Sequence, residues 1–186
     1  MRLISICFIA SILILGCTNT EQPNWGKIVN GLQCRISTSR KIYEPNLSGS
    51  GKGPILIADF RNTSNIALDI RYKTDPNSKE KGYILIESFN VKILESNGQE
   101  VPYFPKAWGV HSDGPDSELM TLKPGDIWTV KSPLRGFMLH LPDTYQITLC
   151  YEVTPELVQR EKQWRKGSYN IWTGEIISNT ITIQIK

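Results

Sequence analysis

The sequence predicts an all-β domain in which antiparallel sheets pack as a sandwich. Apolar and polar residues alternate with a period of two through most of the chain, as expected of strands that bury one face. The apolar runs are short, about eight in number, and separated by clusters of Gly, Pro, Asn and Asp. Many short strands with frequent turns are typical of sandwiches rather than of helical or parallel α/β proteins.

Strands are expected wherever this alternation continues for at least two apolar positions. These segments are residues 32–36, 56–60, 68–72, 84–86, 89–93, 127–130, 145–153 and 181–185. The clearest turn is Asn97-Gly98, because both residue types tolerate positive φ, and it predicts a hairpin. A second turn is expected at 122–126, where Pro and Gly are adjacent.

One segment has the features of a helix. Thr154 can cap its N-terminus, Pro155 suits the first turn, and Gly167 can end it. We therefore expect a short helical insertion before the last strand. Trp164 and Trp172 are expected to hold this insertion against the sheet.

The first sixteen residues have the composition of an export signal. Arg2 supplies one positive charge, and the run 3–15 is apolar apart from two serines. A helix of that length rises about 20 Å, less than the ~30 Å hydrocarbon core of a bilayer, so the run is a poor membrane span. Residues 1–16 are therefore expected to be a signal peptide.

The stretch Ile14–Cys17, Ile-Leu-Gly-Cys, resembles the lipobox of bacterial lipoproteins. The resemblance implies cleavage before Cys17 and attachment of a diacylglyceryl group to its sulfur, so that acyl chains such as palmitate hold the protein on a lipid bilayer. Residues 17–28 would form a lipidated tether on the cell membrane or outer membrane, facing the periplasm or the exterior. The same resemblance implies that Thr18, a residue other than Asp after the cysteine, favours the outer membrane where a cell has two membranes. The alternatives are a plain secretory signal with an incidental cysteine, or a buried helix.

Residues 29–186 are expected to form one domain, because this length can bury a substantial core. Without Arg2 the chain has 20 basic side chains, one fewer than the 21 of the whole chain, against 18 acidic ones. So small a net charge gives no reason to expect a nucleic acid as partner. Besides the bilayer, a protein or a glycan is the expected kind of partner.

The run from Leu141 to Tyr145 resembles the tyrosine corner of immunoglobulin-like domains, where a tyrosine at the start of a strand returns its hydroxyl to the backbone upstream. Further turn and core residues resemble the immunoglobulin-like modules of uncharacterised bacterial lipoproteins: Trp25, 30–34, 43–45, 60–65, 172–175 and 178–179. The resemblance implies an immunoglobulin-like antiparallel β-sandwich and a structural role for Tyr145. A looser resemblance is to the intracellular proteinase inhibitor domain.

Cys34 and Cys150 are the two thiols that remain once Cys17 is acylated. Export would permit a disulfide between them. Cys34 alternates with apolar neighbours and should point inward, whereas Cys150 falls on the opposite face of its strand and should point outward. A bond requires converging Cβ atoms, so two separate thiols are the other alternative.

The remaining candidate residues give no catalytic site, cofactor or metal site. His111 and His140 are far apart in the sequence and belong to no metal-binding motif. The acidic stretch 111–118 could attract a hard cation, but it lacks the spacing of a calcium-binding loop. Five tryptophans could include an exposed platform for a sugar or peptide, although sandwiches usually bury such residues.

The sequence therefore predicts a membrane-anchored lipoprotein whose domain is a non-catalytic binding or structural module of the cell envelope. One alternative is a protease inhibitor that presents a long loop, at 102–118 or 155–171. The other is an enzyme, which would need clustered ionisable groups that the sequence does not reveal.

Overall fold

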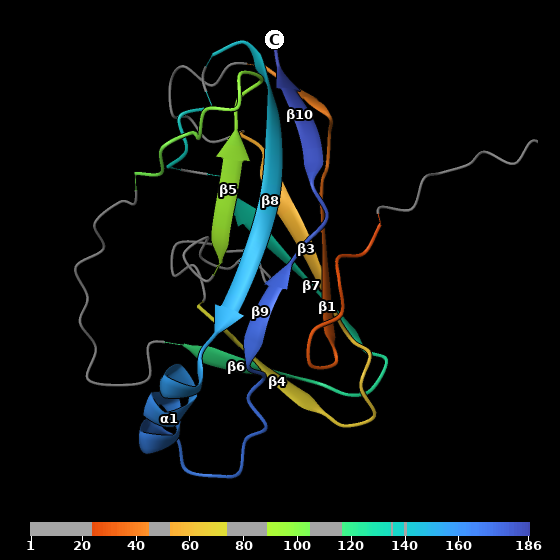
Figure 1. Cartoon of the computed structure of the whole chain (residues 1–186), viewed down its shortest axis with the longest axis vertical. Coiled ribbons are helices and arrows are strands. Elements are labelled where there is room, and N and C mark those ends of the chain that lie inside the picture. The colour runs from red at the N-terminus through yellow and green to blue at the C-terminus, as the bar shows by residue number, and fades with distance from the viewer. Residues whose placement is uncertain (1–23, 45–52, 74–88, 105–116, 135, 140) are drawn as a thin grey trace, which may run out of the picture.

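The protein is mostly β-structure with one helix (Figure 1). The computed structural model describes residues 24–44, 53–73, 89–104, 117–134, 136–139 and 141–186. In chain order the elements are β1 (Leu32–Thr38), β2 (Ile42–Tyr43), β3 (Ile55–Asn62), β4 (Leu68–Tyr72), β5 (Asn90–Leu94), β6 (Glu118–Leu122), β7 (Ile127–Pro133), β8 (Asp143–Val153), α1 (Pro155–Trp164), β9 (Gly174–Ile177) and β10 (Ile181–Ile185).

The strands form two larger sheets and a small ribbon. One sheet has the order β1-β3-β7 and is antiparallel throughout. The other has the order β2-β10-β8-β5, with β9 also paired to β8, and only its β2–β10 pairing is parallel. In Figure 1 the second sheet lies in front of the first, and β4 and β6 form a ribbon at the end where α1 lies.

The β4–β6 ribbon continues the β3–β7 pair beyond a bend. Asn62 ends β3 with its side chain fully buried. Its amide nitrogen donates to the carbonyls of Ile66 and Leu122 at 2.7 and 2.9 Å, and its amide oxygen accepts from the backbone of Ser64 at 2.9 Å. One buried amide thus satisfies the backbone groups that the bend removes from the ladder.

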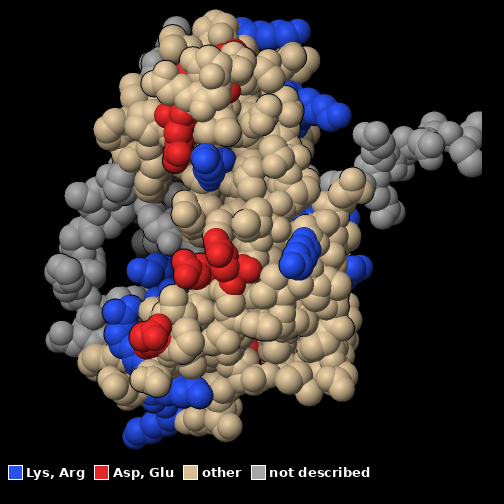
Figure 2. Space-filling model, viewed as in Figure 1, with Lys and Arg blue, Asp and Glu red and all other residues tan. Residues whose placement is uncertain are grey.

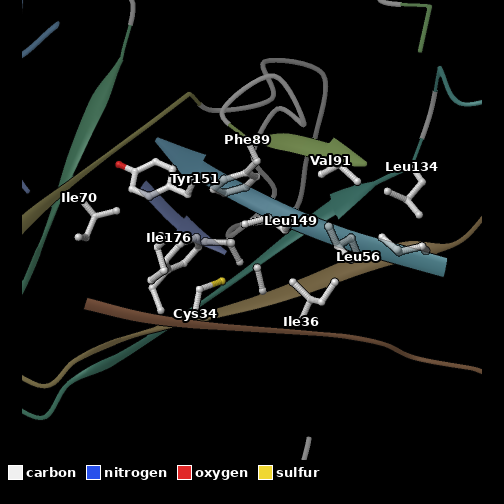
Figure 3. Close-up of a cluster of buried hydrophobic side chains, with 14 of the residues drawn as sticks. Cys34, Ile36, Leu56, Ile70, Phe89, Val91, Leu134, Leu149, Tyr151 and Ile176 are labelled. Atoms are coloured by element: carbon white, nitrogen blue, oxygen red, sulfur yellow. The ribbon is translucent and has the colours of Figure 1, made fainter. Parts of the chain in front are cut away.

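The core lies between the two larger sheets. Alternate residues of β1, β3, β5 and β8 point into it, as the labelled side chains of Cys34, Leu56, Val91 and Leu149 show (Figure 3). Leu149 and Cys34 are both fully buried. This arrangement explains the period of two in the sequence, because each strand presents one face to the opposite sheet.

Most of the strands expected from the sequence are present, and the expected all-β class is confirmed. Three short strands, β2, β6 and β9, were not predicted. The Asn97-Gly98 turn is formed, with Gly98 at φ +86° donating to the carbonyl of Glu95 at 2.9 Å. The expected strand at 84–86 lies outside the described residues.

The helix is confirmed, with one correction to its place. Thr154 caps it by accepting from the backbone of Leu157 at 3.3 Å, and Pro155 is its first residue. The insertion does not precede the last strand alone, because β9 and β10 both follow it. The expected role of Trp164 is wrong: its side chain is 55 % exposed, whereas Trp172 is buried.

Candidate functional site

The predicted attachment residue, Cys17, lies outside the described residues, which begin with Asn24. The next residue, Trp25, lies on the outer face of the β1-β3-β7 sheet. The guanidinium carbons of Arg35 and Arg61 are each 4.5 Å from the centre of its ring. A cation over an indole ring is attracted by the negative face of the ring, so both arginines hold this segment to the sheet.

Side chains on the same face position the two arginines. Arg35 donates from Nε to Asp59 at 2.9 Å, and Thr129 donates to the other oxygen of Asp59 at 2.6 Å. Arg61 donates from Nη2 to Gln33 at 2.5 Å, while its buried Nε has no hydrogen-bond partner among the described residues. The cation–π contact with the Trp25 ring therefore offsets part of the cost of the missing hydrogen bond at the Arg61 guanidinium.

Gly26 fixes the same segment at the edge between the two sheets. Its backbone nitrogen donates to Cys34 in β1 at 2.9 Å, and its carbonyl accepts from the Gln33 amide at 2.8 Å. A Cβ at this position would overlap the carbonyl oxygen of Ile177 in β9. Residues 24–28, which the sequence assigned to the tether, therefore lie partly against the domain.

A buried ion cluster joins helix α1 to the β4–β6 ribbon. Glu161 is only 3 % exposed. Its Oε1 lies 2.7 Å from Nε of Arg71 in β4, and its Oε2 lies 3.0 Å from Nε of Arg165. Ser117 donates its hydroxyl to Oε1 at 2.6 Å, and Arg165 also donates to the Ser117 carbonyl. One carboxylate thus binds two guanidinium groups and a hydroxyl.

The chemistry of this cluster suits a structural role. Burial raises the pKa of Glu161, but the hydrogen bonds from Ser117, Arg71 and Arg165 outweigh burial and hold the pKa below its ordinary value. A carboxylate with a lowered pKa and three donors already bound is a poor general base. The Glu161–Arg165 spacing of four residues was visible in the sequence, but the contact with Arg71 was not.

The structure leaves both remaining thiols free and places them apart. Cys34 is buried between the sheets, and burial strongly raises its pKa. Cys150 lies on the opposite face of β8 from buried Leu149 and donates to Glu175 at 3.3 Å. Burial and this hydrogen bond raise the pKa of Cys150 to about 11. Neither thiol is activated as a nucleophile.

Tyr145 makes the hydrogen bond that a tyrosine corner would make. It is fully buried near the start of β8, and its hydroxyl donates to the carbonyl of Leu141 at 3.0 Å. Tyr151 lies six residues further along β8, and its hydroxyl accepts from the backbone nitrogen of Arg71 at 3.0 Å and donates to the Arg71 carbonyl at 2.9 Å. Both tyrosines therefore tie β8 to neighbouring segments.

The other candidates of the sequence analysis are mostly buried or outside the described residues. Trp172 stacks on Tyr151 with ring centres 5.4 Å apart and donates to Val29 at 3.1 Å, so it belongs to the core. Trp108, His111 and His140 lie outside the described residues, as does nearly all of the acidic stretch 111–118.

A small cavity lies beside β5, with Phe89, Tyr103 and Phe137 among its walls. Its volume is about 170 Å³. Sites for small organic ligands are usually about 300–1,000 Å³, so this cavity is too small for most of them.

The described ranges contain neither a cluster of metal-binding side chains nor a helix suited to a bilayer. No three side chains of the types His, Cys, Asp and Glu are placed there to hold a metal ion. No helix in that part of the chain has the length and apolar character to cross a bilayer. Comparison with protein-family models finds no matching family, and comparison with curated proteins finds no similar sequence.

Proposed function

We propose that this protein is a bacterial lipoprotein, anchored through acylated Cys17, whose domain is a non-catalytic binding or structural module of the cell envelope. The observation that carries the proposal is the sequence of residues 1–17. This segment begins with the basic residue Arg2 and continues with a short apolar run. It ends in Gly16 followed by Cys17, as expected of a lipoprotein signal. Two acyl chains on one sulfur are sufficient for stable attachment to a bilayer.

The order of the strands supports an immunoglobulin-like sandwich as the finer fold. Immunoglobulin domains pair strands A, B and E in one sheet and strands C, F and G in the other. The order β1-β3-β7 corresponds to A-B-E, and the order β5-β8-β10 corresponds to C-F-G. Under this correspondence β8 is strand F, and Tyr145 near its start is where a tyrosine corner belongs.

The non-catalytic role is supported by what the ionisable groups already do. Glu161 is engaged by two arginines, and Asp59 is engaged by Arg35 and Thr129. These carboxylates form ion pairs and hydrogen bonds that hold segments of the domain together. Surfaces of such domains commonly bind other molecules, although a fold alone does not fix a ligand.

The inhibitor alternative is weakened for one of its two loops. The segment 155–171 is no extended loop, because α1 occupies most of it and the Glu161 cluster holds it down. The segment 102–118 stays a candidate. Titration of the protein against proteases of broad specificity separates the two functions, since stoichiometric inhibition would favour the inhibitor.

Replacement of the anchoring residue tests the proposal. The wild-type chain should appear in the membrane fraction and incorporate labelled palmitate, whereas Cys17→Ser should be exported without label and be recovered in the soluble fraction. Cys150→Ser is the matched control and should behave as the wild type. Membrane retention of Cys17→Ser would overturn the proposed anchor.

A further inference from the structure

We propose that the edge formed by residues 24–44 faces the bilayer and contacts anionic lipid headgroups when Cys17 is acylated. This inference rests on the proposed lipid anchor. It adds an orientation: the domain does not turn freely on a flexible tether but is held with one defined edge toward the membrane.

The first argument is the short distance between the anchor and the domain. Trp25 and Gly26 are fixed to the domain by Arg35, Arg61 and Cys34. Seven peptide units separate Cys17 from residue 24, and they span at most about 25 Å in any conformation. A domain of this length is about 40 Å across. The side opposite Trp25 therefore cannot reach the bilayer while the edge near Trp25 lies close to it.

The second argument is charge. Residues 24–44 contain four basic side chains and one acidic side chain, Glu44. Arg35 is paired with Asp59, which leaves Lys27, Arg40 and Lys41 as the basic groups of this edge that can meet headgroups. In Figure 2 blue side chains lie on the right-hand side of the molecule, where Figure 1 places β1 and β10, and others gather at the lower left, while the red ones lie in the middle and toward the left. Basic groups near a membrane surface are attracted to anionic lipids.

The third argument is exposed apolar surface beside these charges. Ile28 is 51 % exposed and follows Lys27, and Ile42 is 49 % exposed and follows Lys41. Pairs of a basic and an apolar side chain suit the interface between headgroups and acyl chains. In the five-stranded sheet β2 is at one edge and β5 at the other, so Lys92 in β5 belongs to the far side.

Lysine footprinting of the anchored protein tests this orientation. The lipidated full-length product would be placed in vesicles of phosphatidylcholine alone or mixed with phosphatidylglycerol, acetylated briefly, and analysed by mass spectrometry. Lys27 and Lys41 should react about fivefold more slowly in the anionic vesicles. Lys92 and Lys162, both exposed, should react equally in the two kinds of vesicle. Equal rates for all four lysines would overturn the inference.

Two variants show whether the fixed segment sets the orientation. Trp25→Ala removes the ring between the arginines, and Gly26→Ala forces the backbone away from Ile177. Both should abolish the protection of Lys41 while palmitate incorporation stays unchanged. Trp164→Ala, which removes an exposed tryptophan from α1, should retain the protection. Persistent protection in the first two variants would contradict the role of the segment.

The same experiment distinguishes the two proposals. Loss of the anchor appears as failure to enter vesicles and absence of a lipid mass, which overturns both. An anchored protein with uniform lysine reactivity overturns only the orientation.

Discussion

Arg71 and Glu161 lie 90 positions apart in the sequence, yet Nε of Arg71 lies 2.7 Å from Oε1 of the buried Glu161 side chain. This contact joins α1 to the β4–β6 ribbon. Because Arg165 and Ser117 complete the coordination of the same carboxylate, α1 is held at one place on the domain rather than forming a loose insertion.

Neutralising the carboxylate should destabilise the protein strongly. Glu161→Gln leaves two half-buried guanidinium groups without the counter-charge of the buried carboxylate, and breaking a buried pair in this way costs about 3–5 kcal/mol. Urea unfolding followed by circular dichroism would measure the loss. Glu156→Gln is the matched control, because Glu156 is an exposed residue of the same helix. An equal and small effect of both substitutions would contradict the structural role of the cluster.

The contribution of Glu161 should depend on pH in a definite direction. Its pKa is lower in the folded protein than its ordinary value, so the unfolded chain binds the proton more readily. The stabilisation is therefore complete above the unfolded pKa of about 4.3 and is lost as the pH falls through the lower folded value. The difference in unfolding free energy between wild type and Glu161→Gln should be constant from about pH 7 to 5 and shrink below about pH 4. A difference that grows on acidification would be inconsistent with this assignment.

The two thiols should react slowly and separately. With a pKa of about 11, Cys150 has on the order of a hundredfold less thiolate near neutral pH than an ordinary cysteine. Cys34 should react only when the protein unfolds, because it is buried. A chromogenic disulfide reagent should detect two reactive thiols per chain in urea without reductant. In the folded protein, Glu175→Gln should increase the reaction rate of Cys150 and leave that of Cys34 unchanged. A chain with no reactive thiol in urea would instead contain a Cys34–Cys150 disulfide.

Removing the Tyr145 hydroxyl should have a measurable cost. Tyr145→Phe loses the bond to Leu141 and leaves a carbonyl short of a donor, so we expect a loss of about 1–2 kcal/mol in the free energy of unfolding. Tyr169→Phe is a suitable control, because its hydroxyl bonds to Lys166 at an exposed position. If the two substitutions have the same effect in urea unfolding, Tyr145 does not fix the start of β8.

The parts of the fold that alternate regularly could be predicted from the sequence. Strand β1 could be predicted from the alternation of Leu32, Cys34 and Ile36, because every second side chain enters the core. Strand β6 was missed because its adjacent residues Leu119 and Met120 are both half-buried, so the period of two is lost. Strand β9 was missed because it is four residues long and begins with glycine.

The candidate sites were less predictable than the strands. The Arg35–Trp25–Arg61 stack depends on the register of β1 against β3, and sequence alternation gives the face of a strand but not its partner. The Arg71–Glu161 contact depends on where α1 packs against the domain, and the two residues are 90 positions apart in the sequence. The signal peptide and the attachment role of Cys17 stay predictions from the sequence, and they could be proposed from it alone because export motifs are contiguous in sequence.

The anchor itself is tested most directly by the mass of the N-terminal peptide from protein purified out of the membrane fraction. We expect a peptide that begins at Cys17 and carries a diacylglyceryl group. A peptide that still begins at Met1, or an unmodified Cys17, would contradict it.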